Sequence, residues 1–312
     1  RLMPEIVISE FLDEAAIASV LKGRDVLYDP KLVDETARLH AALKDARAVV
    51  VRNRTQVRGP LLDAAPQLCV VGRLGVGLDN IDMDACQARG VEVYPATGAN
   101  DVAVAEYVIA AAVILVRRAY AASAEVAAGK WPRNALIGGE VHGRTLGLVG
   151  YGAIARLTAA RARALGMQIV AYDPYLPADD AHWRGVRNLP LHRLLAEADI
   201  VSLHTPLTTE TRRMIGATAI AEMKTTAILI NAARGGVVDE AALAAALRDG
   251  RIAGAALDVF EEEPLGAAAG EKFAGLRNVI LTPHIAGVTE ESNVRVSRVT
   301  LENVATALAR RR

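Results

Sequence analysis

Short runs rich in valine and isoleucine alternate along the chain with longer segments in which apolar residues recur at helical spacing. This alternation is typical of repeated βαβ units around a parallel sheet. Helix-like segments such as Asp34 to Lys44 separate the runs in the first part of the chain. There we expect strands at Glu5 to Ser9, Asp25 to Tyr28, Ala48 to Val51, Leu68 to Val71 and Val91 to Tyr94.

The rhythm is interrupted by a long apolar helix, expected from Asn100 to Ala119, and then restarts. A last helix, from Glu290 to Arg311, has no strand after it and could cross back to pack on the first lobe. Strands with intervening helices suit a doubly wound α/β fold. The strands expected in the second part are Thr145 to Val149, Gln168 to Tyr172, Ile200 to Leu203, Ala227 to Ile230, Ala253 to Leu257 and Val279 to Leu281.

Composition narrows the classes of partner. The 312 residues carry 36 Lys+Arg and 36 Asp+Glu, so no net charge would draw the chain to nucleic acid or to a membrane, and a small-molecule ligand is favoured. Cys69 and Cys86 have neither metal-ligand nor disulfide-framework spacing, so we expect no metal and a reducing cytoplasm. The first residues do not read as a signal peptide, and the apolar stretch 102–116, broken by Glu106, is shorter than the roughly 20 residues of a membrane span.

A glycine-rich turn, GYGAIA at 150–155, directly follows the expected strand TLGLV and opens a helix. Gly150 permits a tight turn, Gly152 lets backbone amides approach a pyrophosphate, and the small Ala155 allows close packing of helix on strand. The next strand ends at Asp173, where a carboxylate can accept hydrogen bonds from an adenosine ribose. Asp173 could instead begin a turn with Pro174. We favour the ribose and expect NAD over NADP, because the carboxylate would repel a 2′-phosphate.

Three polar residues are expected at the carboxyl ends of strands, the edge where open α/β sheets bind ligands. They are Arg234 after AILINAA, Glu263 in DVFEEEP and His284 after LTP. Reduction of a carbonyl needs a cation to polarise it and a general acid to deliver a proton. Singly, each residue has a simpler explanation: a helix-start charge, a solvated acid and a helix cap.

Seven ordered motifs cover nearly the whole chain, and together they resemble the D-2-hydroxyacid dehydrogenase family, in particular its phosphoglycerate-dehydrogenase-like members. The resemblance implies reversible hydride transfer between NAD(H) and C2 of a small 2-hydroxy or 2-keto acid. It implies that Arg234 binds the substrate carboxylate and carbonyl, that His284 is the acid/base and that Glu263 partners the imidazole. The motifs are GRLGVGLDNID (72–82), ANDVAVAE (99–106), TLGLVGYGAIA (145–155), HTPLTTET (204–211), INAARGGVVDE (230–240), LDVFEEEP (257–264) and TPHIAG (282–287).

The same resemblance assigns the two lobes. Residues 1–97 and 288–312 are expected to form a discontinuous, flavodoxin-like substrate domain, and residues 98–287 a Rossmann NAD-binding domain, with the active site in the cleft. Cofactor contacts are implied at Val76, Val104, Gly150, Tyr151, Gly152, Ala153, Ile154, Asp173, His204, Thr205, Pro206, Ala232, Ala233, Asp258 and Gly287. The long inter-lobe helix is expected to form a homodimer interface.

The sequence defines less well which residues would bind the end of the substrate remote from C2. The loop from Arg73 through Leu74 and Gly75 to Gly77 could turn successive amides toward one anion. Arg52, with Arg54 nearby, could add cations for a second anionic group, as in 3-phosphoglycerate or 3-sulfolactate, although solvated surface arginines are an equal alternative. Hydroxypyruvate, glyoxylate, lactate and pyruvate are the other candidates, and Asn53 departs from the serine more usual in phosphoglycerate enzymes.

Two further alternatives stay open at this point. Asn100 could hold substrate or could equally be the N-cap of the long helix. The chain could also be an NAD(H)-sensing binding protein or corepressor on the same fold, with little turnover.

Overall fold

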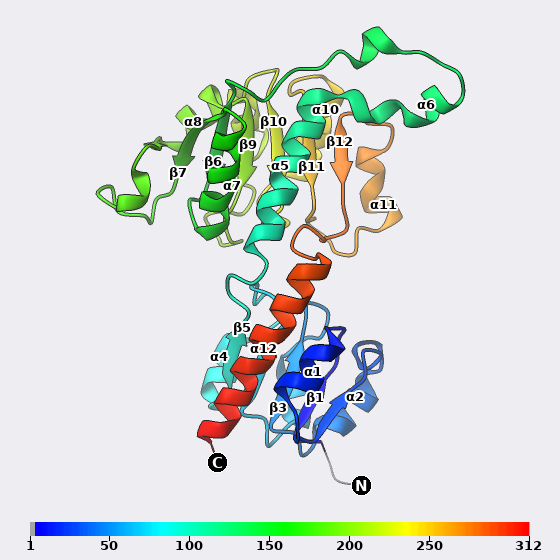
Figure 1. Ribbon diagram of the computed structural model, residues 1–312, viewed down its shortest axis with the longest axis vertical. Helices are drawn as coiled ribbons and strands as arrows, with labels where there is room; N and C mark the ends of the chain where they lie inside the picture. The colour runs from blue at the N-terminus through cyan, green and yellow to red at the C-terminus, as the bar shows by residue number, and fades with distance from the viewer. Residues whose placement is uncertain (1–3, 312) are drawn as a thin grey trace. The chain divides into compact units, whose positions relative to one another are not determined.

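The computed structural model describes residues 4–311 and shows two compact units, each built on its own parallel sheet (Figure 1). One unit consists of Arg1–Asn100 with Val288–Arg312, and the other of Asp101–Gly287. Helices cover both faces of each sheet, as the predicted α/β class requires.

The first unit has five parallel strands in the order β2-β1-β3-β4-β5, which is the flavodoxin-like order. Its last two strands begin one or two residues later than the sequence suggested, and β4 pairs with β3 as far as Gly72 and the partly buried Arg73. The strands are β1 (Ile6–Ile8), β2 (Val26–Tyr28), β3 (Ala48–Val51), β4 (Val70–Arg73) and β5 (Glu92–Pro95).

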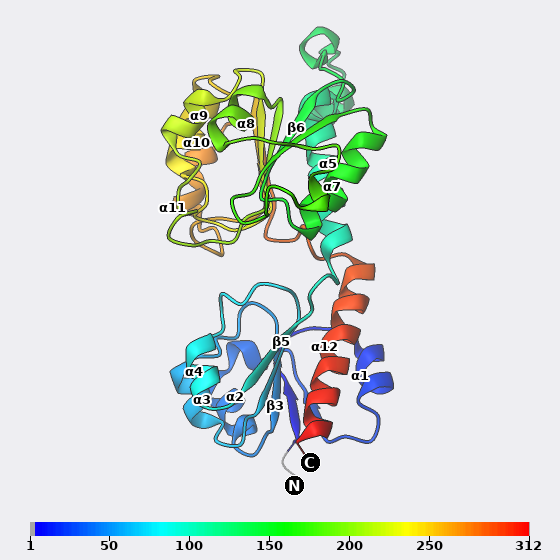
Figure 2. The ribbon, with the colours of Figure 1, turned by 90° about the vertical axis from the view of Figure 1, so that its left-hand side faces the viewer.

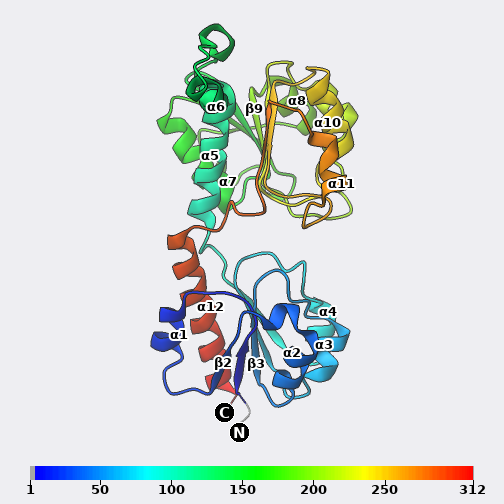
Figure 3. The same ribbon diagram turned by 90° about the vertical axis from the view of Figure 1, so that its right-hand side faces the viewer.

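Two apolar clusters lie on the two faces of this sheet (Figures 2 and 3). On one face are α1 (Glu14–Val20) and the C-terminal helix α12 (Glu290–Arg310). Helix α12 begins with a capping box formed by Thr289 and Ser292, which fixes its first turn. The other face carries η1 (Leu32–Asp34), α2 (Thr36–Leu43), α3 (Gly59–Ala64) and α4 (Met83–Ala88).

The second unit has seven parallel strands in the order β12-β11-β10-β9-β6-β7-β8. Counted within the unit, this is the Rossmann order 3-2-1-4-5-6 with one strand added. The sequence pattern missed β8 because it is an edge strand of two exposed polar residues. The strands are β6 (Thr145–Val149), β7 (Gln168–Tyr172), β8 (Arg187–Asn188), β9 (Ile200–Leu203), β10 (Ile228–Asn231), β11 (Gly254–Leu257) and β12 (Val279–Leu281).

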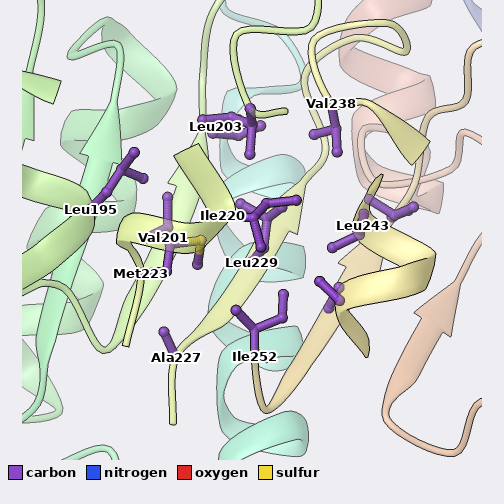
Figure 4. Packing of buried hydrophobic residues seen from close by; sticks show 14 of the residues in the cluster. Leu195, Val201, Leu203, Ile220, Met223, Ala227, Leu229, Val238, Leu243 and Ile252 are labelled. Carbon is purple, nitrogen blue, oxygen red and sulfur yellow. The ribbon is translucent and has the colours of Figure 1, made fainter. Parts of the chain in front are cut away.

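The central strands of this sheet are buried on both faces, so their side chains alternate between two cores. In β10, Leu229 joins the core shown in Figure 4, whereas Ile228 and Ile230 join the opposite one. Helices α5 (Asp101–Arg117) and α7 (Ala153–Ala164) cover one face, and α8 (Leu191–Glu197), α9 (Ala217–Glu222) and α10 (Glu240–Arg248) cover the other (Figure 2).

None of the described helices combines the length and apolar content needed to cross a bilayer. Short helices complete the second unit. They are η2 (Ala119–Ala122), α6 (Ser123–Ala127), η3 (Arg133–Leu136), η4 (Ala181–Trp183), α11 (Ala267–Gly270) and η5 (Glu271–Phe273).

Helix α12 packs directly on β4 at a glycine, and this contact yields a test. A β-carbon at Gly72 would lie 2.6 Å from Val304 Cγ2 and 2.9 Å from Thr300 Cγ2 on α12. We therefore expect Gly72→Ala to reduce the free energy of unfolding by about 1–3 kcal/mol. Thermal unfolding followed by circular dichroism measures this. Gly59→Ala is the control, because a β-carbon there has no neighbour within 4 Å among the described residues; equal melting of both variants would contradict the packing.

Candidate active site

The glycine loop after β6 is shaped by its neighbour at the end of β9. Gly150 has a φ of 88°, and a β-carbon there would lie 2.6 Å from the carbonyl oxygen of His204. At Gly152, which precedes the first residue of α7, a β-carbon would meet no described atom within 4 Å. The space beside Gly152 at the start of α7 is therefore open, as a pyrophosphate site at the amides of Ala153 and Ile154 would require.

Tyr151, the residue between these glycines, is held at three points. Its amide donates to Asp173 Oδ2 at 2.9 Å, and its carbonyl accepts from Arg156 Nη1 at 2.9 Å. Its ring stacks on Trp183 with centroids 5.3 Å apart and planes 11° apart. These contacts fix the glycine loop in the shape that leaves the space beside Gly152 open.

Asp173 lies at the end of β7, where the sequence placed it, and it does begin a turn. Its Oδ1 accepts from the amides of Tyr175 at 2.9 Å and Leu176 at 3.1 Å, while Oδ2 accepts from Tyr151. An ionised carboxylate has about four acceptor positions, so three amides leave room for a further donor. The turn and a ribose contact are therefore compatible.

Two polar residues, His204 and Thr205, follow β9 beside the glycine loop. His204 Nε2 lies 2.9 Å from Ser202 Oγ, and burial lowers the pKa of His204 to about 4, so the ring is neutral at pH 7. The buried Thr205 Oγ1 has no hydrogen-bond partner within the described chain, and Pro206 after it is exposed. Because buried hydroxyls are normally paired, Thr205 fits a site that a polar ligand completes.

The loop after β10 carries Arg234 and is fixed by Asn231, which sequence reasoning missed. Asn231 is 1 % exposed; its Nδ2 donates to Arg234 O at 2.9 Å and its Oδ1 accepts from Ala233 N at 3.1 Å. The Arg234 guanidinium donates through Nη1 to Ala233 O at 2.6 Å. The signal was present, since Asn at a strand end often bonds the backbone two or three residues on.

The Arg234 loop lies against the loop that carries Glu263. A β-carbon at Gly235 would overlap the carbonyl of Phe260 and come within 3.0 Å of the Glu261 amide. The two backbones thus touch, and only glycine allows this approach.

Glu263 and His284 form the expected pair, with Nδ1 of the imidazole 2.7 Å from Oε2 of the carboxylate. The other oxygen, Oε1, accepts from Phe260 N at 3.0 Å. Burial raises the pKa of Glu263, but its hydrogen bonds with His284 and Phe260 and the charges of His284 and Arg234 lower it more. The net pKa lies below its ordinary value, so the group is ionised at pH 7. Arg234 is thus electrically coupled to this pair.

His284 has a left-handed backbone, with φ at 52°, and Asp258 anchors it. The His284 amide donates to Asp258 O at 2.8 Å. The Asp258 carboxylate accepts at 2.8 Å from the amide of Ile285 through Oδ1 and from that of Ala286 through Oδ2. The family resemblance implies a cofactor contact at Asp258; in the structure its carboxylate holds the loop that carries His284.

Arg52 lies in the first unit and is 8 % exposed, so it is not a solvated surface arginine. Its guanidinium lies 4.0 Å from the Phe11 ring centroid and donates to Phe11 O at 3.2 Å and to Asn293 Oδ1 at 2.6 Å. Burial lowers its pKa to about 10, an effect that Glu10 partly offsets. The guanidinium keeps its charge at pH 7, with no ion pair to it among the described residues.

Arg54 differs from Arg52, because it is exposed and already paired with Asp34. The backbone between the two arginines is held by the buried Glu10, which accepts from Arg52 N and Thr55 N at 2.9 Å and from Arg54 N at 3.2 Å. The structure therefore neutralises Arg54 and leaves Arg52 as the buried cation.

The loop after β4 departs from the expected nest. The amide of Leu74 donates to Val51 O and that of Gly75 to Arg73 O, both at 2.8 Å, so these amides do not point at a common anion. Gly75 has a φ of 137°, and the Arg73 side chain folds back over it and donates to Leu74 O at 2.6 Å. Val76 is exposed beside this loop.

Asn100 does not use its side-chain oxygen as a helix cap. Asn100 directly precedes α5, but its buried Oδ1 accepts no hydrogen bond from the described residues, so the N-cap bond is absent and the atom is available to a ligand. Of the other predicted contacts, Val104 is buried in α5, Ala232 and Ala233 are partly buried after β10, and Gly287 ends the second unit. The structure thus groups Arg234, Glu263 and His284 in one unit, whereas Arg52, Arg73, Leu74, Gly75, Val76 and Asn100 belong to the other.

Several known proteins are similar to this chain in sequence. The family model for the D-isomer specific 2-hydroxyacid dehydrogenase NAD-binding domain matches residues 109–286. An (S)-sulfolactate dehydrogenase of Chromohalobacter salexigens is 54% identical over 98% of this chain and 99% of its own length. A D-3-phosphoglycerate dehydrogenase of Methanocaldococcus jannaschii is 39% identical over 98% of this chain, which spans only 58% of that protein.

Solved structures resemble the chain over nearly its whole length. The TT0316 protein from Thermus thermophilus has a TM-score of 0.87 at 34% identity, covering 97% of this chain and 96% of that one. A D-lactate dehydrogenase from Aquifex aeolicus, solved with NAD and lactic acid, has a TM-score of 0.85 at 30% identity, covering 98% and 95%.

The contact between the Arg234 and Glu263 loops can be tested without substrate. Gly235→Ala forces a methyl group into the Phe260 carbonyl, so we expect unfolding to become easier by about 3 kcal/mol, the upper end of overpacking costs. Gly266→Ala is the matched control in the same unit, where a β-carbon has no described neighbour within 4 Å. Chemical denaturation compares the two, and a Gly235 variant as stable as the control would show that the loops do not touch.

Proposed function

The chain belongs to the D-isomer specific 2-hydroxyacid dehydrogenase family, and from this premise we propose which residues perform its reaction and which acid it takes. It is an NAD-dependent oxidoreductase that acts on the CH–OH group of small 2-hydroxy acids. The observation that carries the assignment of residues is the coupling of Arg234, Glu263 and His284 in one unit.

Arg234 binds the substrate carboxylate and polarises the carbonyl at C2. A guanidinium presents paired donors that match a carboxylate, and its charge stabilises negative charge developing on the carbonyl oxygen. Asn231 holds the loop on which Arg234 lies, so the cation is placed before substrate arrives. Such preorganisation makes an electrostatic contribution effective.

His284 delivers the proton to the developing alkoxide in reduction and removes it in oxidation. Because Nδ1 is engaged by Glu263, Nε2 is the nitrogen that serves the substrate. The ionised Glu263 binds Nδ1 and so orients the ring for its acid/base role. Both partners are held by backbone hydrogen bonds at Phe260 and Asp258.

NAD, when bound, supplies the hydride acceptor of the oxidation. The amides of Ala153 and Ile154 would hold its pyrophosphate, and the Asp173 carboxylate its adenosine ribose. The unpaired hydroxyl of Thr205 would complete the site near the glycine loop. Asp173 disfavours a 2′-phosphate, which supports NAD over NADP.

The substrate we propose is 3-sulfolactate, a 2-hydroxy acid with a second anionic group. Identity to a sulfolactate dehydrogenase is 54% over the full length of both proteins, against 39% to a phosphoglycerate dehydrogenase nearly twice as long. The buried Arg52 forms no ion pair among the described residues, because the nearby Glu10 is bound to backbone amides, and a sulfonate would give the guanidinium a direct anionic partner. Asn100 Oδ1 offers an acceptor for a substrate hydroxyl.

The stereochemistry of this substrate agrees with a family specific for D isomers. In lactate the carboxylate outranks the methyl group, but in sulfolactate the sulfur-bearing CH₂ outranks the carboxylate. The same spatial arrangement therefore changes its descriptor, and (S)-sulfolactate has the arrangement of D-lactate.

A cytoplasmic homodimer completes the proposal. Cys69 and Cys86 are both free, as thiols in a reducing compartment are. Large apolar side chains are exposed from the end of α5 through α6 to η3, and beyond α5 this segment extends away from the sheet in Figure 1. Apolar groups gathered in this way are typical of protein interfaces; they are Ile114, Tyr120, Val126, Trp131 and Ile137.

We expect His284→Ala to lower turnover in keto-acid reduction by about 10²- to 10⁴-fold, the contribution of a general acid. NADH binding, measured by fluorescence titration, should stay within about twofold because the nucleotide contacts lie elsewhere. His192→Ala, on the exposed side of α8, is the control. Turnover that survives the loss of the imidazole would refute its acid/base role.

The proposed substrate is tested with sulfopyruvate, phosphohydroxypyruvate, hydroxypyruvate, glyoxylate and pyruvate. We expect the highest kcat/KM for sulfopyruvate and, in the reverse direction, oxidation of the (S) but not the (R) enantiomer. Arg52→Gln should lower kcat/KM for sulfopyruvate by roughly 10- to 100-fold, the worth of a charged hydrogen bond, and that for pyruvate far less. Arg54→Gln should change neither. Equal losses with both acids would show that Arg52 does not bind the sulfonate.

A further inference from the structure

The anchoring of His284 extends beyond the residues of the proposed mechanism. Asp258 at the end of β11 is 1 % exposed, and its carboxylate accepts from the amides of Ile285 and Ala286. A third donor is the hydroxyl of Thr282, 2.6 Å from Oδ1. A buried carboxylate needs such a full set of donors, because each unmade hydrogen bond to it would be costly.

The direction of the next hydrogen bond follows from the number of protons. Tyr107 Oη lies 2.6 Å from Thr282 Oγ1, and by distance alone either atom could donate. A threonine hydroxyl has a single proton, and that of Thr282 is already given to Asp258. Tyr107 must therefore donate to Thr282, which makes a one-way chain from the phenol through the hydroxyl to the carboxylate.

Tyr107 is suited to be the first donor. It lies on α5, partly buried, and its ring packs against the core that α5 and α7 share with the sheet. Burial is the main cause that raises the pKa of Tyr107, and the charge of Asp258 adds to this. The phenol therefore keeps its proton well above neutral pH, and its packed ring points that proton in one direction.

We propose that Tyr107 is a positioning residue for His284, acting through Thr282 and Asp258. The left-handed conformation at His284 persists only where surrounding contacts over-determine it, and the loop from 282 to 286 is over-determined by Asp258. Hydrogen bonds in a chain strengthen one another, so the phenol tightens the bond between Thr282 and Asp258. This inference rests on the proposed acid/base role of His284.

This chain of hydrogen bonds predicts a specific pattern in a double-mutant cycle. Tyr107→Phe removes only the hydroxyl, and Thr282→Val removes the link while nearly conserving shape. We expect kcat in keto-acid reduction to fall about threefold in the first and about tenfold in the second, as for single hydrogen bonds, with KM for NADH unchanged. The double variant should match Thr282→Val alone, because without Thr282 the phenol has no path to Asp258. Thr282→Ser, which keeps a hydroxyl, should restore turnover.

Controls separate this inference from its premise. Thr225→Val, on an exposed threonine of the same unit, should leave kcat unchanged. Additive losses in the cycle, or a fall in stability with kcat intact, would overturn the positioning role while His284→Ala remained inactive. An active His284→Ala variant would instead reject the proposed acid/base role itself.

Discussion

The parallel arrangement of strands is the constraint on which the rest of the second unit depends. Parallel neighbours all end at the same sheet edge, so the residue that follows each strand is brought near the residues that follow the others. Strands β6, β7, β9, β10, β11 and β12 thus deliver to one edge a glycine turn, two acids, a threonine, an arginine and a histidine. The sheet alone therefore brings together groups that are more than a hundred residues apart in sequence, without any contact between their side chains.

Placing groups at one edge is not enough for chemistry, and the loops supply the precision. Gly150 and Gly235 let one strand-end loop lie against the backbone of the next, where any side chain would collide. Buried polar side chains then fix each loop from beneath: Asn231 holds Arg234, and Asp258 holds His284. The strained backbone at His284 shows that these bonds outweigh a local preference, which costs roughly 1–3 kcal/mol. Loops held in this way present charged groups in one geometry, as electrostatic catalysis requires.

Much of this was predictable because it depends on local pattern. Apolar runs located the strands of both sheets, and the turn at Gly150 with Asp173 marked a nucleotide site, since both signals lie within one βαβ unit. The edge strand β8 was missed because two polar residues have no periodicity. Asn231 carries only a weak signal, and the link from Tyr107 to Thr282 carries none, because it joins positions 175 residues apart through packing alone. The resemblance to a family names reacting groups, whereas the contacts that hold them are found only in coordinates.

Arg52 shows how the structure separates two interpretations that the sequence supports equally, a solvated surface arginine and a cation for the substrate. Arg52 and Arg54 are both arginines beyond the same strand, yet one is exposed and paired with Asp34 while the other is buried against Phe11. Burying a guanidinium without a direct ion pair costs free energy that the charge of Glu10, the stacking on Phe11 and two hydrogen bonds to neutral oxygens offset only in part. A fold that retained such a charge for stability alone would gain from an apolar residue at that position. The retained charge is explained if an anionic group of the substrate binds to it. Arg52, and not the number of arginines nearby, therefore supports a second anion.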